Sequence, residues 1–95
     1  MSNANDTSPD HASEISRADN AIKALEHART ALKEARSSIE DAFAVTGDAR
    51  DLEALAKTLA SIESSYVATL FAIRRETARR DAAELAARAA QAEEA

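Results

Sequence analysis

The chain of 95 residues contains no cysteine, one glycine, one proline and only three aromatic side chains. Without cysteine it can form neither a disulfide framework nor a thiolate metal site. Because glycine and proline are needed for most chain reversals, their scarcity excludes the many turns of a β-sandwich or a β-barrel. The length allows one small domain at most. These absences predict a chain that reverses its direction very rarely.

Long apolar runs are also missing. No segment approaches the roughly 18 consecutive apolar residues of a membrane span. The first ten residues are polar and acidic, with neither the basic flank nor the apolar run of a secretory signal. We therefore expect a cytoplasmic protein that does not contact a membrane. The net charge of −5 argues against non-specific binding of nucleic acid, which depends on neutralising phosphates with Lys and Arg.

Alanine is present in abundance. The chain has 25 alanines against 16 residues of Leu, Ile, Val and Phe combined. Alanine is the best helix former, since it loses no side-chain entropy on folding. The composition therefore predicts an all-α protein made of long helices with a thin core, which is a poor candidate for a globular enzyme.

One turn between two helices is expected from the helix-capping residues. Ser8 can cap a helix that has Pro9 at its first position. Gly47 is the only strong stop in the chain and suits the left-handed conformation that ends a helix, while Asp48 can cap the next helix. We predict a disordered arm over residues 1–8, a helix over 9–46, a turn at 47–48, a helix over 49–92 and a frayed end at 93–95.

Apolar residues recur at alternating steps of three and four along both predicted helices, which is the spacing of a coiled-coil seam. A turn of two residues makes the helices antiparallel neighbours and pairs residues at equal distances from Gly47. The alanines of the first helix then fall opposite larger side chains of the second. The predicted first seam is Ala18, Ala21, Leu25, Ala28, Leu32, Ala35, Ile39 and Ala42, and the second is Leu52, Leu55, Leu59, Ile62, Tyr66, Leu70 and Ile73. The fold predicted by these patterns is an antiparallel two-helix hairpin.

Several apolar residues remain beside these seams. They would either widen the core stripe, as in ordinary amphipathic helices, or form a surface for a partner helix. Two helices alone bury little, so we expect a second copy or another helical protein to complete a bundle. The residues expected to bind this partner are Ile15, Ile22, Leu25, Val67 and Phe71.

No catalytic or ligand-binding pattern stands out. His11 and His27 have no second ligand at helical spacing, so a metal site has no support. The serines and threonines lack a neighbouring base, and the single glycine excludes a glycine-rich phosphate loop. We expect no catalytic residue, metal, cofactor or small-molecule substrate, and we expect that the protein is not an enzyme.

The one basic feature is a cluster of four arginines, Arg74, Arg75, Arg79 and Arg80. It is typical of a solvated helix surface laced with salt bridges. An electrostatic contact with an acidic partner or with nucleic acid is the alternative, and in that case the protein would be a dimeric helical regulator. No aromatic residue alternates with the arginines to stack on bases, which favours the solvated surface.

Two short segments carry a resemblance to a known family. They are Gly47-Asp48-Ala49-Arg50 at the turn and Leu59-Ala60-Ser61-Ile62-Glu63-Ser64 in the second helix. Residues 15–73 resemble the small helical-hairpin co-chaperones of type III secretion needle subunits. The resemblance implies a cytoplasmic accessory protein that joins a larger chaperone and keeps a needle subunit soluble. The arginine-bearing tail after Ile73 departs from that pattern.

These patterns favour a non-catalytic protein–protein interaction module that docks a helical partner or self-associates. The alternatives are the nucleic-acid regulator described above and a structural scaffold or filament subunit. A filament subunit would assemble well beyond a dimer as its concentration rises.

Overall fold

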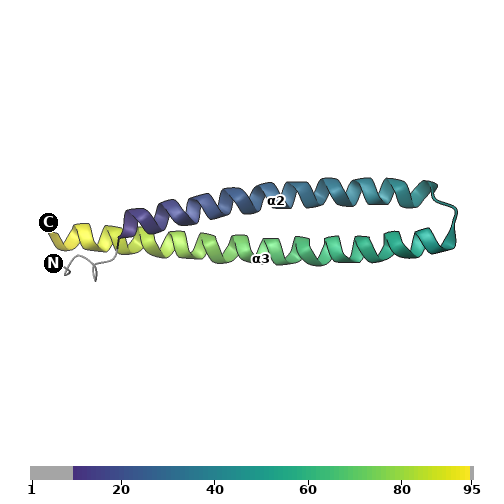
Figure 1. The fold of residues 1–95 in the computed structure, drawn as a ribbon. Helices are drawn as coiled ribbons and strands as arrows, with labels where there is room; N and C mark the ends of the chain where they lie inside the picture. The colour runs from purple at the N-terminus through teal and green to yellow at the C-terminus, as the bar shows by residue number, and fades with distance from the viewer. Residues whose placement is uncertain (1–9, 95) are drawn as a thin grey trace, which may run out of the picture.

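The computed structural model describes residues 10–94, which form two long antiparallel helices (Figure 1). Helix α2 spans His11–Val45 and helix α3 spans Ala49–Glu94. They lie side by side and give a rod with extents of 69 × 26 × 14 Å. The all-α, coiled-coil-like hairpin predicted from the sequence is thereby confirmed.

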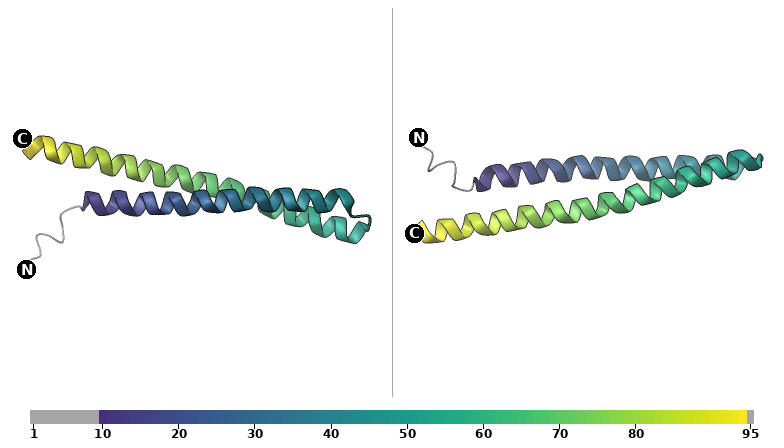
Figure 2. Two further views of the ribbon diagram at one scale, coloured as in Figure 1. Left: turned by 90° about the horizontal axis from the view of Figure 1, so that it is seen from above. Right: turned by 60° about the horizontal axis from the view of Figure 1, so that its bottom comes forward.

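The two helices differ in length and cross each other gently. Helix α3 has 46 residues and α2 has 35, so α3 continues past the first residue of α2 at the end away from the turn, here called the open end (Figures 1 and 2). Figure 2 shows the helices passing over one another along the rod, as expected for seams that repeat every seven residues.

Helix α2 begins at a carboxylate cap. The Ser13 N–H donates to Asp10 Oδ1 at 3.0 Å, and the Glu14 N–H donates to the Asp10 carbonyl at 3.0 Å. The helix therefore starts at His11, two residues after the predicted start, because Asp10 satisfies backbone donors of the first turn. The predicted cap at Ser8 and helix start at Pro9 lie outside the described residues.

The end of α2 differs from the sequence-based prediction. Thr46 leaves the helix in an extended conformation (φ −85°, ψ 131°), and its N–H and hydroxyl both donate to the Ala42 carbonyl, at 3.0 and 2.7 Å. The chain has left the helix before it reaches Gly47, so no left-handed residue is needed. Gly47 has no positive φ, and the prediction of a left-handed conformation there is wrong.

Helix α3 begins with the cap predicted from the sequence. Asp48 Oδ1 accepts hydrogen bonds from the N–H groups of Arg50 at 2.9 Å and Asp51 at 3.1 Å. The carboxylate of Asp51 lies in the first turn, where the helix dipole favours negative charge. The connection is thus the three-residue segment 46–48, closed by a side-chain cap on each side.

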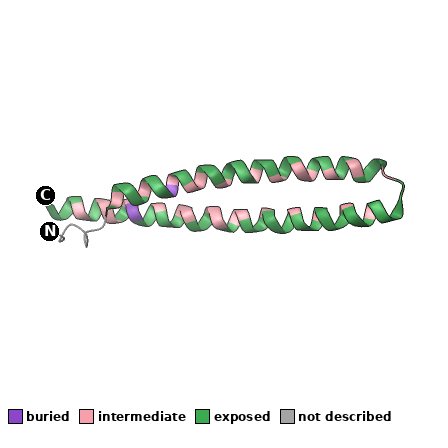
Figure 3. Ribbon diagram, in the orientation of Figure 1, coloured by how far each residue is buried: buried purple, intermediate pink, exposed green. Residues whose placement is uncertain are grey.

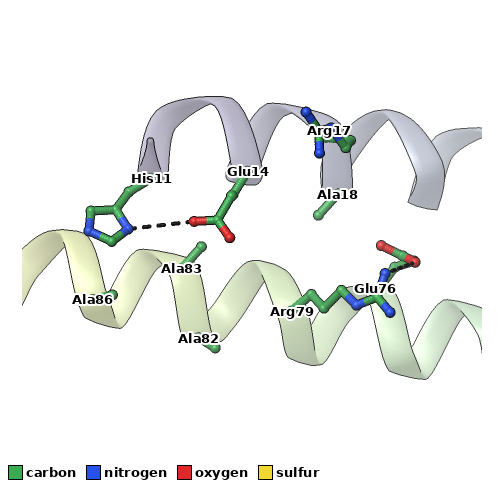
Figure 4. A pocket seen from close by; sticks show the side chains of 9 residues that line it. All are labelled: His11, Glu14, Arg17, Ala18, Glu76, Arg79, Ala82, Ala83 and Ala86. Carbon is green, nitrogen blue, oxygen red and sulfur yellow. Dashed lines mark hydrogen bonds and ion pairs between the residues drawn. The ribbon is translucent and has the colours of Figure 1, made fainter. Parts of the chain in front are cut away.

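The pairing of the helices at the open end follows from the position of the turn. Figure 4 shows Ala18 of α2 across from Glu76 and Arg79 of α3, and Ala83 across from His11 and Glu14. These pairs lie at nearly equal distances from Gly47 along the chain. A short connection between antiparallel helices imposes this register.

The face that α2 turns toward α3 includes residues that the predicted seam left out. Ile15 and Ile22 are half-buried, and so is Arg29, whereas the predicted seam residue Ala28 is exposed. Covering an isoleucine removes more apolar area from water than covering an alanine. The helix therefore turns its larger apolar side chains inward, and the prediction that Ala28 lies in the seam is wrong.

The core is thin along the whole rod. Among residues 10–94, only Ala18 and Ala83 are buried, with 4% and 8% of their surface exposed (Figure 3). The large seam side chains, such as Leu55 and Ile62, are half-buried. The accessible surface is 6943 Å², against about 5300 Å² expected for a compact protein of this mass. The two helices therefore cover two alanines almost completely and the large side chains only in part.

Candidate functional site

The large apolar side chains that the hairpin leaves exposed lie on both helices. In α3, Val67 is 48% exposed, Phe71 51% and Leu85 66%. In α2, Phe43 is 41% exposed and Val45, at the end of the helix, 85%. Exposed apolar residues that gather into patches mark surfaces for partners, whereas scattered ones carry no such meaning.

The five residues predicted to bind a partner divide into two groups. Ile15, Ile22 and Leu25 are half-buried along the contact of α2 with α3. Val67 and Phe71 lie four residues apart on α3, and each exposes about half of its surface. The three α2 residues therefore contribute to the contact between the two helices. Of the five predicted residues, only Val67 and Phe71 of α3 expose a large part of their surface.

The structure adds a groove near the turn that the sequence analysis did not identify. It has a volume of about 430 Å³, and we call it the turn-end groove. Both helices contribute apolar side chains to its lining, and each helix also contributes one glutamate. The lining residues are Glu40, Phe43, Ala56, Leu59, Ala60 and Glu63.

The turn-end groove has a sequence signal that could have revealed it. Ala56 and Ala60 are four residues apart and so lie on one face of α3. Two small side chains in adjacent turns leave a hollow, and the antiparallel register brings Phe43 of α2 to its edge.

A second groove, of about 470 Å³, lies at the open end (Figure 4). Its floor is alanine, and its walls carry charges of both signs. The His11 Nδ1 atom lies 3.7 Å from Glu14 Oε1, and Arg79 Nη1 donates to Glu76 Oε2 at 3.1 Å. The lining residues are His11, Glu14, Arg17, Ala18, Glu76, Arg79, Ala82, Ala83 and Ala86. These lining residues include no hydroxyl or thiol nucleophile for the histidine to activate.

Three of the four clustered arginines contact their own chain. Arg80 donates to Asp19 of α2 at 3.4 Å and to Asp81 at 3.4 Å, and the bond to Asp19 is the main reason that its pKa lies above the ordinary value. Arg79 pairs with Glu76, as described above. The Arg74 guanidinium lies over the Phe71 ring, 5.7 Å from its centroid. The cluster therefore acts largely within the hairpin, as expected for a helix surface laced with salt bridges.

Over residues 10–94, no helix is both long enough and apolar enough to cross a membrane. The same residues hold no group of three or more His, Asp or Glu side chains placed to bind a metal ion.

Comparison of the chain with protein-family models, with curated proteins and with solved structures finds no match. The function is therefore argued from the hairpin and its surfaces.

Proposed function

We propose that this protein is a non-catalytic docking module, whose hairpin provides one layer of a helical bundle while a helical partner provides the other. The observation that carries the proposal is the incomplete core. Two alanines are the only buried residues among those described, while Val67 and Phe71 stay about half exposed. A partner laid over these side chains would remove apolar surface from water, which is the main driving force for association.

The resemblance of residues 15–73 to needle-subunit co-chaperones supports one class of partner, a larger helical chaperone in the cytoplasm. Phe71 is the side chain on which such a partner would depend most. Large aromatic residues supply a disproportionate share of interface energy, and the Arg74 guanidinium already holds one face of this ring.

The experiment uses the tagged full chain as bait in an extract of its source cells. The wild type is compared with Phe71→Asp and with Val45→Asp, a matched control that places the same charge at an exposed apolar residue beside the turn. A protein retained by the wild type and by the control is then purified, and its affinity is measured by calorimetry. We expect Phe71→Asp to weaken binding ~30-fold or more. Equal affinity of all three baits for every purified candidate would overturn the proposal.

A further inference from the structure

Two surfaces of the hairpin are complementary to each other and cannot meet within one chain. The first is the turn-end groove, with its apolar floor and the carboxylates of Glu40 and Glu63 beside it. The second is a projection on α3, made by the Phe71 ring and the Arg74 guanidinium that lies over it at 5.7 Å. An aromatic ring that carries a positive charge matches an apolar hollow whose lining includes the carboxylate of Glu40.

Both surfaces lie along one row of α3. Ala60 of the groove, Val67 and Arg74 are spaced seven residues apart, so they occupy the same position in successive heptads. Phe71 lies between Val67 and Arg74 in the sequence, and the Arg74 guanidinium lies over the Phe71 ring. The groove and the projection are therefore offset along the helix by the eleven residues from Ala60 to Phe71, about 16 Å at the rise of an α-helix.

We infer that two copies of this chain pair antiparallel, with the Phe71 ring of each copy in the turn-end groove of the other. This inference rests on the proposed docking function and makes a second copy, in place of a larger chaperone, the partner that covers Phe71. A two-fold axis near Ser64 forms both contacts at once. Because each copy carries the groove and the projection on the same face, the rotation that places the first ring in the second groove also places the second ring in the first groove. Val67, which is 48% exposed, lies close to the axis and becomes covered.

The charges agree with this arrangement. Arg74 follows Phe71 by one turn of α3, so in the antiparallel pair it lies nearer than Phe71 to the turn of the other copy, at about the height of Glu40. Glu63 already accepts a hydrogen bond from Arg36 at 3.2 Å, whereas Glu40 makes no ion pair among residues 10–94. Arg74 of one copy therefore supplies the cation that Glu40 of the other copy lacks.

The surface of the rod is large enough for a second copy. Because it is elongated, the chain exposes about 1600 Å² more than a compact protein of its mass, and a stable interface covers about 800 Å² on each partner. Phe71 is already about half covered within the hairpin, so docking removes roughly 100 Å² per side chain from water, and there are two in the pair. A symmetric interface doubles every favourable contact, which a single exposed aromatic residue on a monomer cannot do.

The first test is the solution mass of the full chain by light scattering at several concentrations, with helix content measured by circular dichroism. We expect the wild type and Val45→Asp to be dimers of twice 10.1 kDa. Phe71→Asp should remain helical and raise the dimer dissociation constant ~30-fold or more. A helical wild-type monomer at all concentrations would overturn the pairing. It would leave the proposed docking function standing, because that function is tested separately with other proteins.

A charge exchange tests the contact itself. The Arg74→Glu variant alone and the Glu40→Arg variant alone should each be monomeric. In either homodimer, residues 74 and 40 of opposite copies would carry like charges at both contacts. Mixing the two variants should restore a dimer, because in the mixed pair both contacts join opposite charges. If both single variants stay dimeric, or if the mixture stays monomeric, the proposed geometry is wrong.

A cross-linking experiment locates the axis independently of charge. Since the chain has no cysteine, Ser64→Cys introduces a single thiol close to the proposed two-fold axis, where it meets its own counterpart. A short bismaleimide should join two copies of this variant at high yield. Ser37→Cys, on α2 and exposed, is the matched control and should give little dimer. Equal yields for the two variants would contradict the proposed axis.

Discussion

The half of the hairpin near the turn and the half near the open end pack in different ways. In the turn half, residues 32–63, the seam is built from large side chains such as Leu32, Leu55 and Ile62, all of them half-buried. In the open half, residues 11–31 and 64–94, the two buried residues are alanines, Ala18 and Ala83. The open half also has half-buried large side chains, such as Leu25 and Leu70, so the difference is that, among the described residues, only the open half covers a side chain almost completely.

This difference shows what two helices can bury without a third layer. A methyl group fits between two helices in contact, whereas a leucine extends past the zone that they cover. In an isolated hairpin a large side chain is therefore covered only in part, and its remaining surface is available to a partner. The turn-end groove lies in the turn half, where Leu59 contributes to both the seam and the groove floor.

The largest effect is expected from Leu55→Ala in the turn half. Leu55 is half-buried and does not line the turn-end groove, so the change removes seam contacts without touching the proposed interface. We expect a loss of about 2 kcal/mol in the free energy of unfolding, at the low end for a leucine truncation because the site is half exposed. Urea unfolding followed by circular dichroism, at one protein concentration, measures it. The control is Leu85→Ala, 66% exposed, which should change stability by less than ~0.5 kcal/mol. If both changes cost the same, the contacts of Leu55 in the seam add nothing to stability beyond those of an exposed leucine.

A smaller effect is expected from removing a methyl group in the open half. Ala83→Gly loses both helix propensity and a buried methyl, whereas Ala68→Gly, at an exposed site of the same helix, loses propensity alone. We expect about 1 kcal/mol for Ala68→Gly and roughly 0.8 kcal/mol more for Ala83→Gly. The same unfolding experiment gives both values. Equal losses would show that burial of Ala83 adds nothing beyond its helix propensity.

Most of the fold could be predicted from the sequence because it depends on local rules. The scarcity of turn residues, the heptad spacing and the cap at Asp48 each act over a few neighbouring residues, and together they specify an antiparallel hairpin. The conformation of Gly47 was mispredicted because Thr46 ends the helix by donating hydrogen bonds to the Ala42 carbonyl. A helix that ends in this way does not need a left-handed glycine after it.

The site was less predictable because it depends on how each helix is rotated about its own axis and on where small residues leave space between larger ones. Heptad spacing alone does not say whether Ala28 or Arg29 turns inward, since the two differ by one step around the helix. The turn-end groove is a hollow beside Ala56 and Ala60. Hydrophobic periodicity is carried by large side chains, so it does not reveal a space next to small ones. The exposed pair Val67 and Phe71 was identified because both residues lie off the seam.

The smallest effect concerns an ion pair that joins the two helices. Arg36 Nη1 lies 3.2 Å from Glu63 Oε1, and its guanidinium also lies over the Tyr66 ring, 5.7 Å from the centroid. In the Phe71→Asp background, which is expected to be monomeric, both partners are substantially exposed, so a double-mutant cycle of Arg36→Gln and Glu63→Gln should give a coupling of only about 0.5 kcal/mol. Added salt should reduce it, because exposed charges are screened. In the open half, a cycle on Arg80 and Asp19 should have the same sign and the same salt dependence. A coupling that salt leaves unchanged would mean that the bridge between Arg36 and Glu63 is shielded from water, as it would be beneath a second copy seated in the neighbouring groove.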